Sequence, residues 1–434
     1  MIRALTQRFS RVPVRQLSGY IGGVAVRGSE VLGKFVLYML VARELGAHDS
    51  GLFFLCFTWV GLAATAARMG FERAMMRHIP AELAVGETRA AKSALLIGMM
   101  ATGAGGIVMG IVTALVAAPA ARWVFHQPDL ATPLAWAGLM LVPQTMLVSV
   151  ACALIGLKRG VLAQLFQNTL WPILTLIALL LGAKELLPLL LALTGALTLC
   201  ALAGAAAIYR ERRQFNTTSV TMPSSDREVL PPIWRTALPL CMVELIQISL
   251  NSLPMLALGA FASAADVGAF SVANRISMLI WVVSLSIGTI SAPLFAEYHR
   301  LRQMDKLRAA NRLTRRTVTI LGLPAVLAMM IVPGWLLGLI GHDFTIAAAP
   351  LMVMSIGQMV NCLTPCQDIL LAMTGHGRTL RLINILQLIV CVALGAALIP
   401  LYGMMGAAIL TTIFTALGAI GTTVAARRLL PEGC

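Results

Sequence analysis

The sequence predicts an all-α integral membrane protein with twelve transmembrane helices in two pseudo-symmetric six-helix bundles. Of its 434 residues, 59% are apolar and only 12% are charged, and the mean hydropathy is +0.85. So few charged residues cannot coat a water-soluble surface of this size. The apolar residues form continuous runs as long as a helical membrane crossing, not the short alternating segments of a β-barrel. The two halves of the chain also resemble each other.

Each helical crossing of a bilayer needs about 20 predominantly apolar residues. Twelve runs meet this requirement: 18–42, 51–70, 93–118, 133–157, 161–181, 186–209, 237–261, 267–296, 317–339, 347–373, 382–399 and 404–426. They divide the chain into five parts: a basic N-terminus (1–17), a first bundle (18–209), a polar linker (210–236), a second bundle (237–426) and a tail (427–434).

The basic residues predict the orientation of these helices. Of the 33 Lys and Arg residues, 27 fall on one side of the predicted membrane, 3 on the other and 3 within spans. Because cytoplasmic loops are enriched in Lys and Arg, we expect a multi-pass protein of the bacterial inner membrane with both termini and the linker cytoplasmic. The net charge of +15 is confined to short clusters between apolar runs, which argues against nucleic-acid binding.

The halves repeat at an offset of 217 residues. Asp49 and Gly51 with the following Leu-Phe-Phe correspond to Asp266 and Gly268 with the following Ala-Phe-Ser. Six spans per repeat keep both repeats in the same orientation, so the pseudo-symmetry axis lies along the membrane normal. Such a pair of bundles is expected to enclose a central cavity.

Charged side chains inside the first span are the strongest functional signal. Arg27, Glu30 and Lys34 lie at i, i+3 and i+7, so they fall within about 60° of one another on one helix face. A charged residue at mid-span costs roughly 2.5–3.5 kcal/mol unless it is paired or hydrated. We expect this stripe to line the cavity and bind substrate; the alternative is intrahelical ion pairs that only allow the helix to insert.

The offset of 217 places a second polar stripe in the seventh span, at Glu244, Gln247 and Asn251. The eighth span adds Asn274 and Arg275. We assign all five to the same cavity. Glu244, like Glu30 in the first stripe, is a candidate counter-ion or proton-coupling group.

Lys34 and Arg275 are predicted to lie at matched depth, about 12 Å below the outer surface at 1.5 Å per residue. Such a basic pair would hold an anion such as a phosphate or a uronate, although Arg275 could instead snorkel to the interface. Three amides of the fifth span, Gln164, Gln167 and Asn168, are explained equally well by hydrogen bonds between helices and by substrate contact. The cysteines and histidines form no metal-ligand pattern.

The order of several short motifs resembles the polysaccharide (O-antigen-type) flippases of the multidrug/oligosaccharidyl-lipid/polysaccharide exporter superfamily. The resemblance covers residues 18–426. Its motifs are Gly33-Lys-Phe35, Val41-Ala-Arg-Glu-Leu-Gly46, Gly51-Leu-Phe53, Val267–Arg275, Gly375-His-Gly-Arg378 and Ile399–Ala408. One departure is Ala47, where the family often has proline.

This resemblance implies a V-shaped fold that moves an undecaprenyl-pyrophosphate-linked oligosaccharide (an O-antigen, capsule or exopolysaccharide unit) across the inner membrane by alternating access. It implies a cationic cavity, for which Arg27, Lys34 and Arg275 are the candidates. The implied partners are the lipid-linked oligosaccharide, membrane lipids and other polysaccharide assembly proteins, and we expect a monomer.

Two other functions stay open. Glu30 and Glu244 leave room for a proton- or sodium-coupled multidrug exporter of the same superfamily. A membrane glycan polymerase or ligase would need a sizeable outer loop with Arg and His, whereas the longest predicted outer loop, 119–132, holds only Arg122 and His126. We therefore expect no enzymatic activity, no metal and no cofactor, with H⁺ or Na⁺ as the candidate coupling ion.

Overall fold

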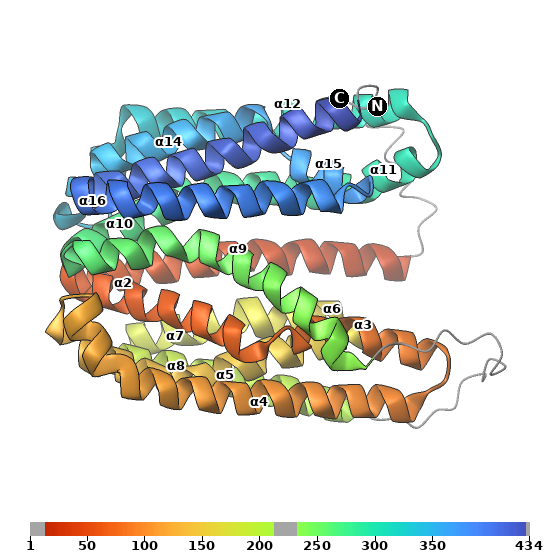
Figure 1. Ribbon diagram of the computed structural model, residues 1–434, viewed down its shortest axis with the longest axis horizontal. Helices are drawn as coiled ribbons and strands as arrows, with labels where there is room; N and C mark the ends of the chain where they lie inside the picture. Colours follow the sequence, from red (N-terminus) through yellow and green to blue (C-terminus); the bar gives the residue numbers. More distant parts are fainter. Residues whose placement is uncertain (1–13, 212–231, 431–434) are drawn as a thin grey trace. The chain divides into compact units, whose positions relative to one another are not determined.

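The computed structural model describes residues 14–211 and 232–430, with side chains from residue 29 onward except at 286, 289, 290 and 293. The regular elements of these residues are helices (Figure 1). This follows from the composition, because a helix satisfies its own backbone hydrogen bonds in a medium without water. Ten of the described helices are long and apolar enough to cross a membrane. The predicted N-terminus (1–17) and linker (210–236) lie largely outside the described residues, as does half of the predicted tail (427–434).

The elements in chain order are α2 (Val14–Arg68), α3 (Phe71–Ala84), α4 (Thr88–Pro119), η1 (Ala120–Val124), η2 (Pro128–Leu130), α5 (Ala131–Gly156), α6 (Gly160–Gln164), η3 (Leu165–Leu170), α7 (Trp171–Leu180), α8 (Leu186–Arg210), α9 (Ile233–Phe261), α10 (Ala264–Ser277), α11 (Leu279–Arg300), α12 (Met304–Ile331), α13 (Pro333–Gly338), η6 (His342–Ala347), α14 (Ala348–Leu363), α15 (Gln367–Met373) and α16 (Gly377–Leu429).

Two of the long helices each contain two predicted spans. α2 is interrupted at Gly46 (φ 72°, ψ 179°) and α16 at Gly403 (φ 52°, ψ −127°). At each interruption the helix turns back on itself (Figure 1). Only glycine adopts these backbone angles without strain. The predicted spans 18–42 and 51–70, and 382–399 and 404–426, are thus joined by single-residue turns, and ten long helices accommodate twelve crossings.

The chain forms two compact units. The first comprises Met1–Tyr38, Ala63–Ala118 and Thr132–Glu244; the second comprises Met39–Leu62, Pro119–Ala131 and Leu245–Cys434. The second unit thus includes two segments from the first half of the sequence. One reason is that the Gln127 side chain donates hydrogen bonds to the carbonyl oxygens of Gly259 (3.3 Å) and Ala262 (2.9 Å) at the end of α9.

The first unit has an apolar core between α3, α4, α5 and α9, in which Met75, Ile79 and Ala153 are fully buried. A buried ion pair lies at the turn into α3. Arg68 Nε is 3.1 Å from Glu72 Oε1, and these side chains are only 9% and 2% exposed. The second Glu72 oxygen makes no hydrogen bond among the described residues. This pair joins the end of α2 to the start of α3.

In the second unit α2 and α10 cross at small residues. A Cβ at Gly51 would lie 1.8 Å from the carbonyl oxygen of Ala264, and one at Gly268 would lie 2.0 Å from that of Ala47. α10 begins there with a capping box, in which Ser263 and Asp266 exchange side-chain and backbone hydrogen bonds. The backbones can approach this closely only where side chains are absent.

Candidate functional site

A polar network lies in the first unit, in the part of α2 that precedes the turn. Lys34 is 12 residues before Gly46, which is about 18 Å along the helix axis. Its ammonium group donates to Glu30 Oε1 and to Asn168 Oδ1, both at 2.9 Å. The other Glu30 oxygen accepts a hydrogen bond from Gln164 Nε2. Glu30 and Lys34 are 17% and 26% exposed, so the pair is largely withdrawn from solvent.

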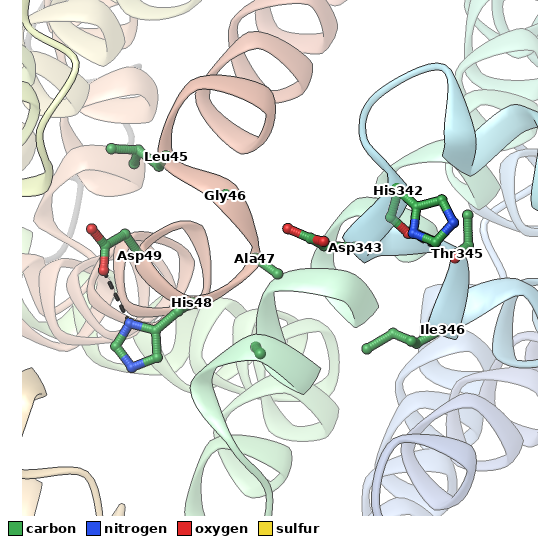
Figure 2. Close-up of a pocket in the computed structure, with 10 residues that line it drawn as sticks. Leu45, Gly46, Ala47, His48, Asp49, His342, Asp343, Thr345 and Ile346 are labelled. Carbon is green, nitrogen blue, oxygen red and sulfur yellow. Dashed lines mark hydrogen bonds and ion pairs between the residues drawn. The ribbon is translucent and has the colours of Figure 1, made fainter.

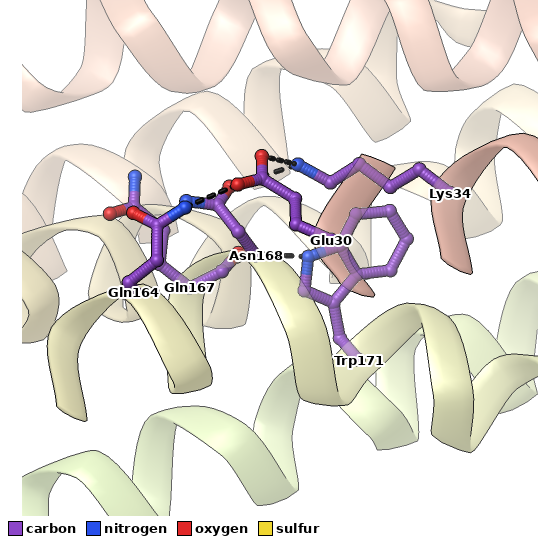
Figure 3. A network of polar contacts seen from close by, with 6 residues as sticks. All are labelled: Glu30, Lys34, Gln164, Gln167, Asn168 and Trp171. Carbon is purple, nitrogen blue, oxygen red and sulfur yellow. Dashed lines mark hydrogen bonds and ion pairs between the residues drawn. The ribbon is translucent and has the colours of Figure 1, made fainter. Parts of the chain in front are cut away.

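The partners of Glu30 and Lys34 come from one short stretch, residues 164–171, which runs from α6 through η3 to α7 (Figure 3). The Lys34 ammonium stands 5.8 Å from the centre of the Trp171 ring. Trp171 is 6% exposed, and its indole N–H donates to the carbonyl oxygen of Gln167 at 2.9 Å. The Trp171 ring therefore restrains the position of the Lys34 ammonium. The sequence alone did not identify this residue, because a tryptophan in an apolar run carries no special signal.

η3 is a π-helical turn. Pro172, which follows it, cannot donate the hydrogen bond that the carbonyl of Asn168 would accept in an α-helix, and its ring crowds that carbonyl. A wider turn relieves this conflict. π-helical turns are rare and are found frequently at functional sites.

The second predicted stripe is divided between the two units. Glu244 is the last residue of the first unit, where its carboxylate lies 2.7 Å from Arg73 Nη2. Gln247 and Asn251 belong to the second unit and are exposed; Asn251 Nδ2 donates to the Gln247 carbonyl at 2.8 Å. The sequence predicts Glu244 as a candidate counter-ion in the cavity. In the structure its ionic partner is Arg73 of α3.

Arg275 and Asn274, on α10, are both partly buried. The Arg275 guanidinium lies 4.5 Å from the centre of the Phe54 ring, which belongs to the same unit. This distance is within the range of a cation–π contact. The side chain of Arg27 lies outside the described part of the chain, so its predicted role stays a prediction.

The second unit also contains a pocket of about 720 Å³ beside the turn at Gly46 (Figure 2). Its polar lining includes His48, Asp49, His342 and Asp343, and His48 Nδ1 lies 3.0 Å from Asp49 Oδ1. None of the predicted cavity residues lines this pocket. Among the residues that the structure describes, no group of three His, Cys, Asp or Glu side chains could hold a metal ion.

Two family models match the chain. The model described as "Polysaccharide biosynthesis protein" matches residues 24–299, and the MatE model matches residues 239–398. The chain is 30% identical over 184 residues to "Probable flippase AglR" of Haloferax volcanii, a match that covers 41% of this chain and 38% of AglR. The chain thus spans well under half of the length of this curated relative.

Solved structures with a similar fold are membrane transporters. An inward-facing multidrug resistance MATE family transporter of the MOP superfamily has a TM-score of 0.72 at 17% identity, covering 94% of this chain and 98% of the other. Lipid II flippase MurJ in an inward closed conformation has a TM-score of 0.71 at 12% identity, covering 94% and 87%. At these identities the likeness establishes the fold.

The multi-pass helical fold and the sequence match lead to one assignment. The first family model covers more than half of the chain and includes the Glu30–Lys34 pair of α2 and the 164–171 stretch. The chain therefore belongs to the polysaccharide biosynthesis protein family, the polysaccharide flippases of the multidrug/oligosaccharidyl-lipid/polysaccharide exporter superfamily.

Proposed function

We propose that this protein is a flippase that moves an undecaprenyl-pyrophosphate-linked oligosaccharide across a bacterial inner membrane by alternating access. Family membership supports this proposal, as does the similarity to a probable flippase and the fold shared with a lipid II flippase. The observation that carries it is the polar network of Glu30, Lys34, Gln164 and Asn168 within predicted membrane spans. Polar groups at such a position are expensive, and they usually mark a transport pathway.

Arg275 is the candidate contact for the anionic part of this substrate. A guanidinium stays charged under all physiological conditions, and its planar N–H groups match the oxygens of a phosphate. The contact with Phe54 restrains the side chain, so less rotational freedom is lost when an anion binds. The lipid tail would remain in the bilayer during transfer.

A multidrug exporter is the second candidate function. The MatE match to residues 239–398 and the MATE transporter fold favour it. Such a protein would move an amphipathic drug in exchange for H⁺ or Na⁺, and Glu30 and Glu244 would be its candidate coupling groups. The location in the inner membrane with cytoplasmic termini rests on the distribution of the basic residues, for either function.

The test is leaflet transfer in proteoliposomes, with the lipid-linked oligosaccharide extracted from the source organism. Wild type should transfer this lipid, and Arg275→Ala should slow transfer about tenfold or more, because a charge-assisted hydrogen bond contributes about 1.5–3 kcal/mol. The matched control is Arg235→Ala, which removes an exposed arginine stacked on Trp234 at 5.1 Å. Transfer at the wild-type rate in Arg275→Ala would refute the anion site. Drug efflux without any glycan-lipid transfer would refute the flippase.

A further inference from the structure

The Glu30 network carries no net charge among its described members. The single ammonium of Lys34 is compensated by the single carboxylate of Glu30 at 2.9 Å. The remaining members, Gln164, Gln167 and Asn168, are neutral amides. The Glu30 carboxylate would repel a phosphate that approached Lys34.

The amides of the network retain hydrogen-bonding capacity. Asn168 uses its carbonyl oxygen for Lys34, and Gln164 uses its amino group for Glu30. The Asn168 amino group, the Gln164 carbonyl and the whole Gln167 amide make no side-chain hydrogen bond to another described residue. All three residues are only partly buried. Each amide can both donate and accept, so together they present a mixed surface of donors and acceptors.

The local backbone places these amides together. The π-helical turn Leu165–Leu170 carries Gln167 and Asn168 on the side of Glu30 and Lys34, and Figure 3 shows all three amides gathered beside the ion pair. The Trp171 ring contacts the Lys34 ammonium, and its indole N–H donates a hydrogen bond to the Gln167 carbonyl. The amides are thus positioned by contacts that do not use their free donor and acceptor groups.

A hydroxyl group is the ligand that fits this arrangement, because it too can both donate and accept hydrogen bonds. We propose that the Glu30 network binds the sugar hydroxyls of the glycan and does not bind the diphosphate. This inference rests on the proposed function, since it assigns one part of the lipid-linked oligosaccharide to one site. Partly buried amides that find no hydroxyl partner remain unpaired, and a site of this kind therefore discriminates against substrates that lack the hydroxyls.

The test compares two substrates in the same proteoliposomes. One is the lipid-linked oligosaccharide extracted from the source organism; the other is undecaprenyl diphosphate, which has the same lipid and diphosphate but no sugar. The variant is Gln167→Leu, which removes an amide without disturbing the Glu30–Lys34 pair. Its matched control is Gln144→Leu, a partly buried glutamine of α5 in the same unit that makes no hydrogen bond to a described residue.

We expect Gln167→Leu to slow transfer of the full substrate about fivefold at sub-saturating concentration, the effect of one lost hydrogen bond, and to leave transfer of the sugar-free undecaprenyl diphosphate unchanged. Gln144→Leu should transfer both at the wild-type rate. Equal slowing of both lipids in Gln167→Leu would assign the network to the diphosphate and overturn the inference, as would full activity on both. If wild type transfers neither lipid, the flippase proposal itself fails. Asn168→Leu, checked for an unchanged unfolding temperature, provides a second variant with the same expected pattern.

Discussion

Gly51 and Ala264 approach so closely that a Cβ at residue 51 would stand 1.8 Å from the Ala264 carbonyl oxygen. The reciprocal contact, a Cβ at Gly268 against the Ala47 carbonyl, would measure 2.0 Å. Both pairs are related by the 217-residue offset of the sequence repeat. The repeat therefore contributes the same Ala-x-x-x-Gly surface twice to a single crossing of α2 and α10.

Substitution at this crossing should destabilise the protein. Gly51→Ala and Gly268→Ala each force a methyl group onto a backbone carbonyl that cannot rotate away, at a cost of about 1–3 kcal/mol. Thermal unfolding in detergent, followed by tryptophan fluorescence, measures the loss. Because both glycines serve one crossing, Gly51→Ala/Gly268→Ala should lose less than the sum of the single losses.

The control for the crossing is Gly61→Ala in the same helix. A Cβ at Gly61 would meet nothing within 4 Å. Alanine is the better helix former by about 0.8–1 kcal/mol, so this variant should unfold at the wild-type temperature or higher. A Gly51→Ala protein as stable as Gly61→Ala would contradict the close contact.

Two arginine–glutamate pairs of the first unit, Arg68–Glu72 and Arg73–Glu244, should differ in their effect on stability. Glu72→Gln leaves the buried Arg68 without its counter-charge, which costs about 3–5 kcal/mol. Glu244→Gln breaks a pair in which Arg73 is 45% exposed, and such pairs contribute about 0–1 kcal/mol. The unfolding temperatures of the two variants, measured together, check the order. Replacing both Arg68 and Glu72 by Met and Leu should recover much of the loss, because no unpaired charge remains.

The turns within α2 and α16 should not tolerate side chains. Gly46→Ala and Gly403→Ala place a Cβ on backbone conformations that cost about 1–3 kcal/mol for other residues. Gly334→Ala is the control, since Gly334 lies in helix α13 without a positive φ and a Cβ there would meet nothing within 4 Å. Lowered expression and a lowered unfolding temperature are expected only for the first two variants. Equal behaviour of all three would argue against the turns.

His78 should make stability depend on pH. It lies on α3, outside the ten long apolar helices, 3.0 Å from the Thr236 hydroxyl. Burial, and then the charge of Arg77, lower the pKa of His78 below its ordinary value of about 6.5. As the pH falls, His78 is therefore protonated in the unfolded chain before it is protonated in the folded protein. The contribution of His78 to the free energy of unfolding is fully present above pH 6.5 and is lost as the pH falls toward the folded-state pKa.

His78→Gln removes this titration and can keep a hydrogen bond to Thr236. Its unfolding temperature should depend less on pH than that of wild type between pH 7.5 and 5.5. His126→Gln, at an exposed histidine, should retain the wild-type dependence. Identical pH profiles for His78→Gln and wild type would show that His78 does not contribute.

The predicted orientation can be tested by cysteine labelling. The seven cysteines of the described chain are free and buried, so they should react slowly, and Cys434 can be replaced by serine. Cysteines introduced at Arg122 and Lys184 should react with an impermeant maleimide added to spheroplasts. Those at Arg89 and Lys306 should react only after lysis, because the charge distribution predicts a cytoplasmic location. All four positions are exposed. The opposite pattern would reverse the topology.

Hydrophobic runs were enough to predict the helices, and helical spacing offered the Glu30–Lys34 ion pair as the alternative to a stripe that lines the cavity. Both follow from local rules, one from the thickness of the bilayer and the other from 3.6 residues per turn. The identity of Gln164 and Asn168 as partners was not predictable in this way. That choice depends on which helix packs beside α2, and no spacing within α2 encodes it.

Glu244 illustrates a different limit. The repeat offset aligns it with Arg27 of the first half, yet its ionic partner Arg73 belongs to α3 and has no relation to the offset. The Gly51–Ala264 crossing, in contrast, had a visible signal, because the repeat motif itself contains Gly51 and Gly268. Small residues that recur in both halves of one chain are not enough to predict a backbone contact. The contact can be predicted only when it is known that the two segments pack against each other.

The single-residue turn at Gly46 fixes the angular register of the α2 segment that follows it. Inserting or deleting one residue between Gly46 and Gly51 would rotate the rest of the helix by about 100° and shift it by about 1.5 Å. Gly51 would then leave the Ala264 carbonyl and a bulkier neighbour would take its place. A longer loop could change its conformation to accommodate one residue more or less. A single-residue turn has no additional residues that could do this.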